Sequence, residues 1–205
     1  MTDEQYYELI QPYADAKEIM LSRLGTLKHN LYSEPSYKSI HTIQDRIKKK
    51  TSMEKKLQKK GVEATPMNAK DYLQDIAGIR VICYFVNDIY RLVDTIKMQA
   101  DLIVVRERDY ISKPKENGYR SFHLIVCVPL YYTDGMEYFP VEIQFRTMAM
   151  DFWASMEHRI LYKKAREDRL PVAMELQEYA EMLMSIEQRF EHFSPAELQN
   201  IPSNG

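Results

Sequence analysis

The centre of the chain carries an apolar run, a helical pattern and further apolar runs in succession. Residues 79–85 are mostly β-branched or aromatic, which is typical of a buried strand. Apolar residues then recur at helical spacing over 89–96, and Asn87 precedes them in position to cap a helix. Three more strands are predicted at 102–106, 122–128 and 139–145. This order predicts an α+β domain built on a mixed sheet.

Helical patterns stand at both ends of the chain. Apolar residues keep helical spacing through the first thirty residues, up to a stop at 33–36 that contains a proline. Near the other end, a helix over 147–165 precedes a last helix over 172–193. The last helix has apolar residues three and four apart: Leu176, Tyr179, Leu183, Ile186, Phe190 and Phe193. Such a seam packs either against its own domain or against a second copy of the chain.

Two shorter elements precede the centre. Residues 37–48 predict a strand in which Arg46 and Lys48 share one face. Residues 51–60 predict a helix that ends at Gly61. These elements bring a group of basic side chains up to the edge of the predicted sheet.

The formal net charge of −2 conceals two segments of opposite sign. Residues 46–60 hold eight basic side chains against Glu54 alone, whereas residues 167–197 hold eight acidic side chains against Arg169 and Arg189. A basic run of this kind is typical of a solvated helix face, a nucleic-acid patch or a polyphosphate site. Because the sequence has no 18-residue apolar run and no leader-like start, we expect a cytoplasmic protein without a membrane span.

Glycine is scarce, and this restricts how the chain can hold phosphates. Neither common glycine-rich phosphate loop can be written from the six glycines, so charged side chains must bind any phosphate. A second polar and basic group surrounds an aromatic ring: Arg108, Lys113, Lys115, Asn117, Tyr119, Arg120 and His123. An aromatic ring among cations is suited to a nucleotide, because the ring stacks on the base while the cations meet phosphates.

Two carboxylates stand in apolar surroundings. Asp75 lies just before the strand at 79–85, and Glu142 lies inside the strand at 139–145 with Gln144 on the same face. An acid in an apolar strand costs free energy unless it meets a cation or a metal. Carboxylate oxygens suit Mg²⁺, which takes one or two of them together with substrate phosphates. A salt bridge to a nearby Lys or Arg is the alternative.

Four motifs occur in a fixed order: RIK at 46–48, DIAGIR at 75–80, KENGYRSFH at 115–123 and VEIQFRT at 141–147. In these motifs, over about residues 37–165, the chain resembles the small alarmone synthetases, which are single-domain members of the RelA/SpoT superfamily. The resemblance implies a nucleotidyltransferase-like mixed β-sheet of about five strands, flanked by helices, with long N- and C-terminal helices. It also implies one synthetase domain over 1–205 that forms a homotetramer through the terminal helices at 1–34 and 167–197.

The family transfers the β,γ-pyrophosphate of ATP to the 3′-hydroxyl of GTP or GDP, which yields (p)ppGpp and AMP. By resemblance, Arg46 and Arg80 sandwich the adenine of ATP, while Lys48, Ser52 and Lys56 hold its phosphates. The basic run is longer here than the motif requires, which leaves open which lysine meets which phosphate.

The resemblance also assigns the metal and the acceptor. Asp75 binds Mg²⁺, and Glu142 either helps to bind it or accepts the proton of the 3′-hydroxyl. Tyr119 stacks on guanine. The remaining residues assigned to GTP or GDP are Arg108, Lys113, Lys115, Asn117, His123 and Gln144.

Several alternatives stay open at this point. The sequence has no His-Asp dipeptide and no room for a second domain, so we expect a synthetase without hydrolase activity. Toxic relatives pyrophosphorylate adenosine nucleotides or the 3′ end of tRNA instead. An RNA-binding regulatory module with lapsed catalysis is the third reading, although the presence of both Asp75 and Glu142 argues against it. Single-stranded RNA and an allosteric alarmone stay open as further partners.

Overall fold

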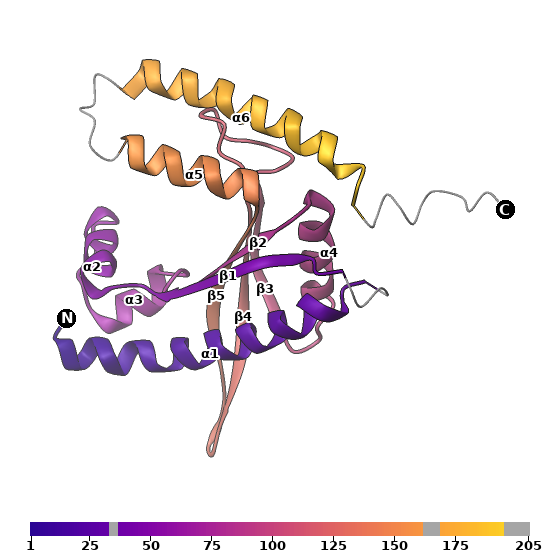
Figure 1. The fold of residues 1–205 in the computed structure, drawn as a ribbon. Helices are drawn as coiled ribbons and strands as arrows, with labels where there is room; N and C mark the ends of the chain where they lie inside the picture. Colours follow the sequence, from indigo (N-terminus) through magenta and orange to yellow (C-terminus); the bar gives the residue numbers. More distant parts are fainter. Residues whose placement is uncertain (33–36, 162–168, 195–205) are drawn as a thin grey trace.

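The computed structural model describes residues 1–32, 37–161 and 169–194, in which six helices surround one five-stranded sheet (Figure 1). The helices are α1 (Asp3–Asn30), α2 (Lys50–Lys59), α3 (Pro66–Tyr72), α4 (Val86–Lys97), α5 (Met148–Leu161) and α6 (Arg169–Glu191). The strands are β1 (Ile40–Ile47), β2 (Ala77–Cys83), β3 (Ile103–Asp109), β4 (Phe122–Tyr132) and β5 (Gly135–Thr147). The predicted α+β class is confirmed. The stop expected at 33–36 lies outside the described residues, as do 162–165 of the helix predicted at 147–165.

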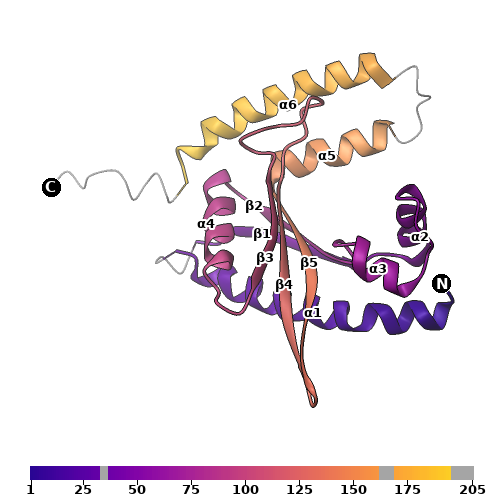
Figure 2. The same ribbon diagram turned by 180° about the vertical axis from the view of Figure 1, so that it is seen from behind.

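The sheet is mixed, as predicted, and has the strand order β1-β2-β5-β4-β3. β2 and β5 are parallel, whereas every other neighbouring pair is antiparallel. β4 and β5 form a hairpin that is longer than predicted and projects beyond α1 (Figures 1 and 2). The long connection between β2 and β5 is what parallel neighbours require, because a tight turn joins antiparallel strands only.

The two faces of the sheet differ in chemistry. On β5, Val141, Ile143 and Phe145 are buried in the main core, and α1 packs across β1, β2, β4 and β5 on that side. Successive residues of a strand point to opposite faces, so Glu142 and Gln144 lie on the other side. We call this second side the open face. Within the described ranges, no helix is long and apolar enough to cross a bilayer.

The N-terminal cap of α4 and the presence of α3 differ from the sequence prediction. α4 begins at Val86, so Asn87 lies inside the helix and the prediction that it is the cap was wrong. The buried carboxylate of Asp88 accepts a hydrogen bond from the Phe85 backbone N–H at 3.1 Å and supplies the cap from within the first turn. α3 was not predicted, although Pro66 at its start is a typical first helical residue.

Some residues of the apolar seam predicted for the last helix pack against α5, whereas the others are exposed. Leu176 is buried against Trp153 of α5, and Leu183 packs partly on the same cluster. Tyr179, Ile186, Phe190 and Phe193 are exposed. Figure 1 shows α5 and α6 side by side beyond one end of the sheet. Packing on its own domain therefore accounts for only part of the seam.

Candidate active site

Strand pairing arranges the residues of the open face in two rows. From β1 to β3, the first row is Arg46, Gly78, Glu142, Ile125 and Arg106. The second row is Gln44, Arg80, Gln144, His123 and Arg108. Glu142 therefore stands on the central strand, with an arginine at each end of its row.

Two cavities meet at Glu142, and both of them include it in their lining. The first cavity has a volume of about 210 Å³ and lies over β1, β2 and β5, where Arg46, Arg80 and Gln144 face it. The second cavity has a volume of about 310 Å³ and extends over β4 and β3. The charged residues and the histidine of the second cavity, besides Glu142, are Lys56, Lys60, Asp71, Asp75, Arg106, Arg108 and His123.

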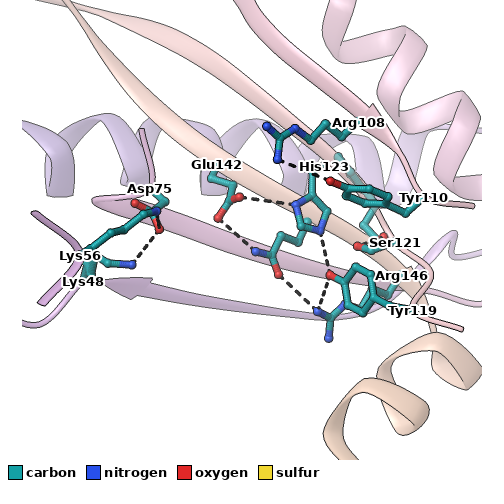
Figure 3. Close-up of polar contacts among 12 residues, drawn as sticks. Lys48, Lys56, Asp75, Arg108, Tyr110, Tyr119, Ser121, His123, Glu142 and Arg146 are labelled. Carbon is teal, nitrogen blue, oxygen red and sulfur yellow. Dashed lines mark hydrogen bonds and ion pairs between the residues drawn. The ribbon is translucent and has the colours of Figure 1, made fainter. Parts of the chain in front are cut away.

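Asp75 is the point where two lysines converge. The lysine nitrogens of Lys48 and Lys56 each lie 2.7 Å from the same oxygen, Oδ2 of Asp75 (Figure 3). The other oxygen, Oδ1, is buried and has no hydrogen-bond partner among the residues described. Burial raises the pKa of Asp75, but the hydrogen bonds and charges of the two lysines outweigh it and hold the pKa below its usual value. The carboxylate is therefore ionised at neutral pH.

Lys48 reaches this position from just beyond the end of β1. The strand ends at Ile47, and the Lys48 backbone N–H donates to the Ile76 carbonyl at 2.8 Å. Lys48 thus lies one residue beyond the strand that was predicted to include it. The structure brings Arg46 to the first cavity and Lys48 to Asp75, which lines the second.

Glu142 contacts its neighbours in the second row. The Gln144 amide donates a hydrogen bond to it at 3.1 Å, and Nδ1 of His123 lies 3.5 Å from its Oε1. Burial raises the pKa of Glu142, whereas the His123 ring and the Gln144 amide lower it. The net shift is downward even though the nearby charge of Asp75 opposes it. Glu142 is therefore an ionised acceptor facing both cavities.

The Tyr119 ring is surrounded by cations. Its hydroxyl lies 2.8 Å from Nε2 of His123 and accepts a hydrogen bond from Arg146 at 3.0 Å (Figure 3). The Lys115 ammonium lies 4.9 Å from the ring centroid, and the Arg146 guanidinium carbon lies 5.4 Å from it. An electron-rich ring held in this way presents an aromatic surface close to the positive charges of Lys115 and Arg146.

The other predicted site residues are less closely grouped. Ser52 is exposed in the first turn of α2, and Lys113 is exposed in the β3–β4 loop, which spans residues 110–121. The Asn117 side chain accepts a hydrogen bond from the Tyr119 backbone N–H at 3.2 Å and donates one to Glu157 at 3.4 Å. Asn117 therefore shapes the β3–β4 loop in this conformation.

Sequence reasoning missed Arg106 and Arg146 as site residues. Arg106 faces the second cavity, and Arg146 bonds both to Tyr119 and to Asp151, the latter at 3.0 Å. The alternation of strand residues was the available signal, because Arg106 lies two positions from Arg108 and Arg146 lies two positions from Gln144.

A sheet that sets an ionised glutamate between two cation-lined cavities defines an α+β enzyme of the phosphate-transferring type. Sequence comparison narrows this class, because residues 45–167 match the family model described as a region found in RelA / SpoT proteins. The chain therefore belongs to the RelA/SpoT family, as the motifs predicted.

Named relatives agree with this assignment. The chain is 39% identical to GTP pyrophosphokinase YwaC of Bacillus subtilis (strain 168) over 183 residues, which cover 89% of this chain and 84% of that protein. It is 36% identical to GTP pyrophosphokinase YjbM of the same strain over 181 residues, with 88% and 84% covered. The crystal structure of small alarmone synthetase 1 from Bacillus subtilis bound to its product pppGpp matches with a TM-score of 0.82 at 33% identity. That match covers 97% of this chain and 100% of the other, so the predicted fold is confirmed.

Proposed function

We propose that this chain is a (p)ppGpp synthetase, which transfers the β,γ-pyrophosphate of ATP to the 3′-hydroxyl of GTP or GDP. The observation that carries the proposal is the position of Glu142 between two cation-lined cavities on one face of the sheet. Two nucleotides in adjoining cavities can meet at such a carboxylate. The relatives named above are GTP pyrophosphokinases, which favours a guanosine acceptor over an adenosine nucleotide or a tRNA end.

The adenine of ATP is assigned to the first cavity, and its phosphates are assigned to the lysines around Asp75, where the lining of the second cavity begins. Arg46 and Arg80 come from neighbouring strands and face this cavity, so their planar guanidinium groups can stack on an adenine from two sides. Lys48 and Lys56 converge on Asp75, and they supply positive charge for the phosphates together with the hydroxyl of Ser52.

The guanosine acceptor is assigned to the second cavity and the β3–β4 loop. Tyr119 offers its ring to guanine, and His123 lies between this ring and Glu142. Arg108 lines the second cavity and can meet the acceptor phosphates. Lys113, Lys115, Asn117 and Gln144 complete the acceptor residues that we propose.

Mg²⁺ is the proposed cofactor, held by Asp75 and Glu142. The buried and unpartnered Oδ1 of Asp75 fits a metal ligand, because a buried carboxylate oxygen otherwise lacks a partner. No group of three or more His, Cys, Asp or Glu side chains in the described ranges is arranged to hold a metal. Two carboxylates completed by substrate phosphates suit Mg²⁺, which would neutralise phosphate charge.

The chemistry needs alignment and charge more than covalent participation by the protein. The 3′-oxygen forms a bond to the β-phosphorus of ATP, and the bond from that phosphorus to the oxygen bridging to the α-phosphate breaks. AMP leaves with the bridging oxygen. We assign the proton of the 3′-hydroxyl to Glu142, because this carboxylate is ionised and faces both cavities.

A direct assay tests the function. Purified protein is incubated with ATP, GTP and Mg²⁺, and the nucleotides are then separated by ion exchange. We expect AMP and pppGpp in equal amounts, and ppGpp when GDP replaces GTP. Parallel reactions with an adenosine acceptor or with tRNA distinguish the alternatives. If no AMP and no 3′-pyrophosphorylated guanosine forms, the proposal is wrong.

We further propose that 1–205 is one synthetase domain that assembles as a homotetramer in the cytoplasm. The exposed apolar side chains in the last part of α6 and just beyond it support a contact between copies, because Ile186, Phe190 and Phe193 are each more than half exposed. Analytical ultracentrifugation is expected to give four times the 24.3 kDa mass of one chain. A monomer mass at micromolar concentration contradicts this assembly.

A further inference from the structure

Glu187 is a buried acid that lies far along the chain from the catalytic strand. It comes from α6, and only 7% of it is exposed. Its Oε2 accepts a hydrogen bond from Arg120 at 3.0 Å, and its Oε1 accepts one from the Thr147 hydroxyl. A buried carboxylate costs free energy unless donors of this kind satisfy it, so the burial of Glu187 depends on these two partners.

The two donors belong to the two parts of the chain that form the proposed acceptor site. Arg120 directly follows Tyr119 in the β3–β4 loop, and Thr147 ends β5, the strand that carries Glu142. The Thr147 hydroxyl also accepts a hydrogen bond from the Met150 backbone N–H at 3.3 Å, in the first turn of α5. One carboxylate on α6 thus joins the stacking ring's loop to the catalytic strand.

The β3–β4 loop touches α6 at a second point, through its backbone. Gly118 has a φ of +86°, and a Cβ added there would lie 2.6 Å from the Ala180 Cβ and 3.2 Å from the Gln177 Cα. The loop closes on itself at this contact, because the Gly118 N–H donates to the Lys115 carbonyl at 2.8 Å. α6 therefore backs the turn that presents Tyr119.

Trp153 of α5 makes a third connection. Its ring centroid lies 6.4 Å from that of Tyr119, and its indole N–H donates to the Leu176 carbonyl of α6 at 2.7 Å. It is the one tryptophan in the sequence, so intrinsic tryptophan fluorescence reports on this junction alone. The loop, α5 and α6 therefore meet at the back of the Tyr119 ring.

We propose that Glu187 is a positioning residue for the guanosine acceptor, a role that rests on the function proposed above. Glu187 touches no reacting atom. By holding Arg120 and Thr147 together, it fixes the Tyr119 ring relative to Glu142, so that a stacked guanosine presents its 3′-hydroxyl to that carboxylate. Misplacement of reacting groups by 1 Å costs about a hundredfold in rate, so a distant contact of this kind matters.

Glu187→Gln is the informative substitution, because it keeps the shape of the side chain and removes its charge. The amide has one acceptor oxygen and therefore cannot accept from both Arg120 and Thr147 with separate oxygens. We expect the KM for GTP to rise about tenfold while the KM for ATP stays within about twofold of wild type. Glu178→Gln, at an exposed position of the same helix, is the matched control and keeps both KM values.

A substitution of Arg120 tests the same contact from its other side and does not depend on the folding of the Glu187 variant. Arg120→Gln leaves the Glu187–Thr147 contact in place and is expected to raise the KM for GTP by a similar factor. The double variant is expected to show no further rise, because both substitutions remove one shared contact. Titration with GDP in the absence of ATP, followed by Trp153 fluorescence, is expected to give the same loss of affinity without turnover.

The outcomes separate this proposal from a purely structural role. If Glu187→Gln lowers thermal stability but leaves kcat, the KM for GTP and the Kd for GDP unchanged, Glu187 only anchors α6. Effects that multiply in the double variant also overturn the proposal. Wild-type protein that forms no AMP contradicts the transferase function itself, whereas an active wild type with an unaffected variant contradicts only the positioning role.

Discussion

The Tyr119 hydroxyl lies 2.8 Å from Nε2 of His123, whose other ring nitrogen lies 3.5 Å from Glu142. Three side chains from the β3–β4 loop, β4 and β5 thus form one chain of contacts, of which His123 and Glu142 line the second cavity (Figure 3). The ring that we assign to guanine and the carboxylate that we assign to the 3′-hydroxyl proton are therefore oriented by the same histidine.

Two substitutions of Tyr119 distinguish the contribution of its ring to GTP binding from that of its hydroxyl. Stacking of an aromatic side chain on a base is worth about 1–3 kcal/mol, so Tyr119→Ala is expected to raise the KM for GTP by about tenfold or more. Tyr119→Phe keeps the ring and is expected to stay within about threefold of wild type. Initial rates at varied GTP and saturating ATP measure both. Equal losses in the two variants would instead assign the role to the hydroxyl contacts.

Glu142→Gln is expected to abolish most turnover while the fold and nucleotide binding persist. A positioned general base contributes about 10²–10⁴-fold, and the amide cannot accept the proton at neutral pH. AMP formation under single-turnover conditions measures the loss, and GDP titration checks binding. Glu137→Gln makes the same change at an exposed position of the same strand and is expected to behave as wild type. Full activity of Glu142→Gln would remove this residue from the reaction.

Asp75→Asn is expected to remove the response to Mg²⁺. The variant lacks the charge that draws Lys48 and Lys56 together, and it offers a weaker oxygen ligand. We expect no recovery of activity at any Mg²⁺ concentration, whereas wild type is activated by Mg²⁺ and inactivated by EDTA. Asp134→Asn, in the exposed turn of the β4–β5 hairpin, serves as the control. A variant that saturates with Mg²⁺ as wild type does would exclude Asp75 as a ligand.

The open face of the sheet was predictable because strands alternate with a period of two. Placing Val141 and Ile143 in the core puts Glu142 and Gln144 on the opposite face, and the structure confirms this arrangement. The register across neighbouring strands was not predictable, since it depends on pairing between distant segments. Alternation could have placed Arg106 on the face of Arg108, but only the register shows that it occupies the row of Glu142 from the far edge of the sheet.

The contacts of α6 were beyond sequence reasoning for a different reason. A spacing of three and four residues fits a helix that faces its own domain and one that faces a partner, so the seam could not be assigned to either. Glu187 was counted only as one of the eight acidic side chains of residues 167–197, and the structure buries it against Arg120. Its role depends on a loop 67 residues earlier in the chain, which no local pattern reveals.

Asp88 gives the stability of the protein a characteristic dependence on pH. It is fully buried, and burial is the main cause that raises its pKa from 3.8 to about 6, against the opposing hydrogen bonds of Tyr32, Tyr37 and the Phe85 N–H. The folded state therefore binds a proton at a pH where the unfolded chain has lost it. Between about pH 4 and pH 6 the contribution of Asp88 to the free energy of unfolding falls as the pH rises.

Asp88→Asn removes this titration, so wild type should lose about 1 kcal/mol relative to the variant between pH 5 and pH 7. Urea unfolding of both proteins at the two pH values measures the difference, because all groups that titrate alike in both cancel. Asp94→Asn, at an exposed position of the same helix, is expected to follow wild type at both pH values. Parallel stability profiles for wild type and Asp88→Asn would mean that Asp88 stays ionised in the folded protein.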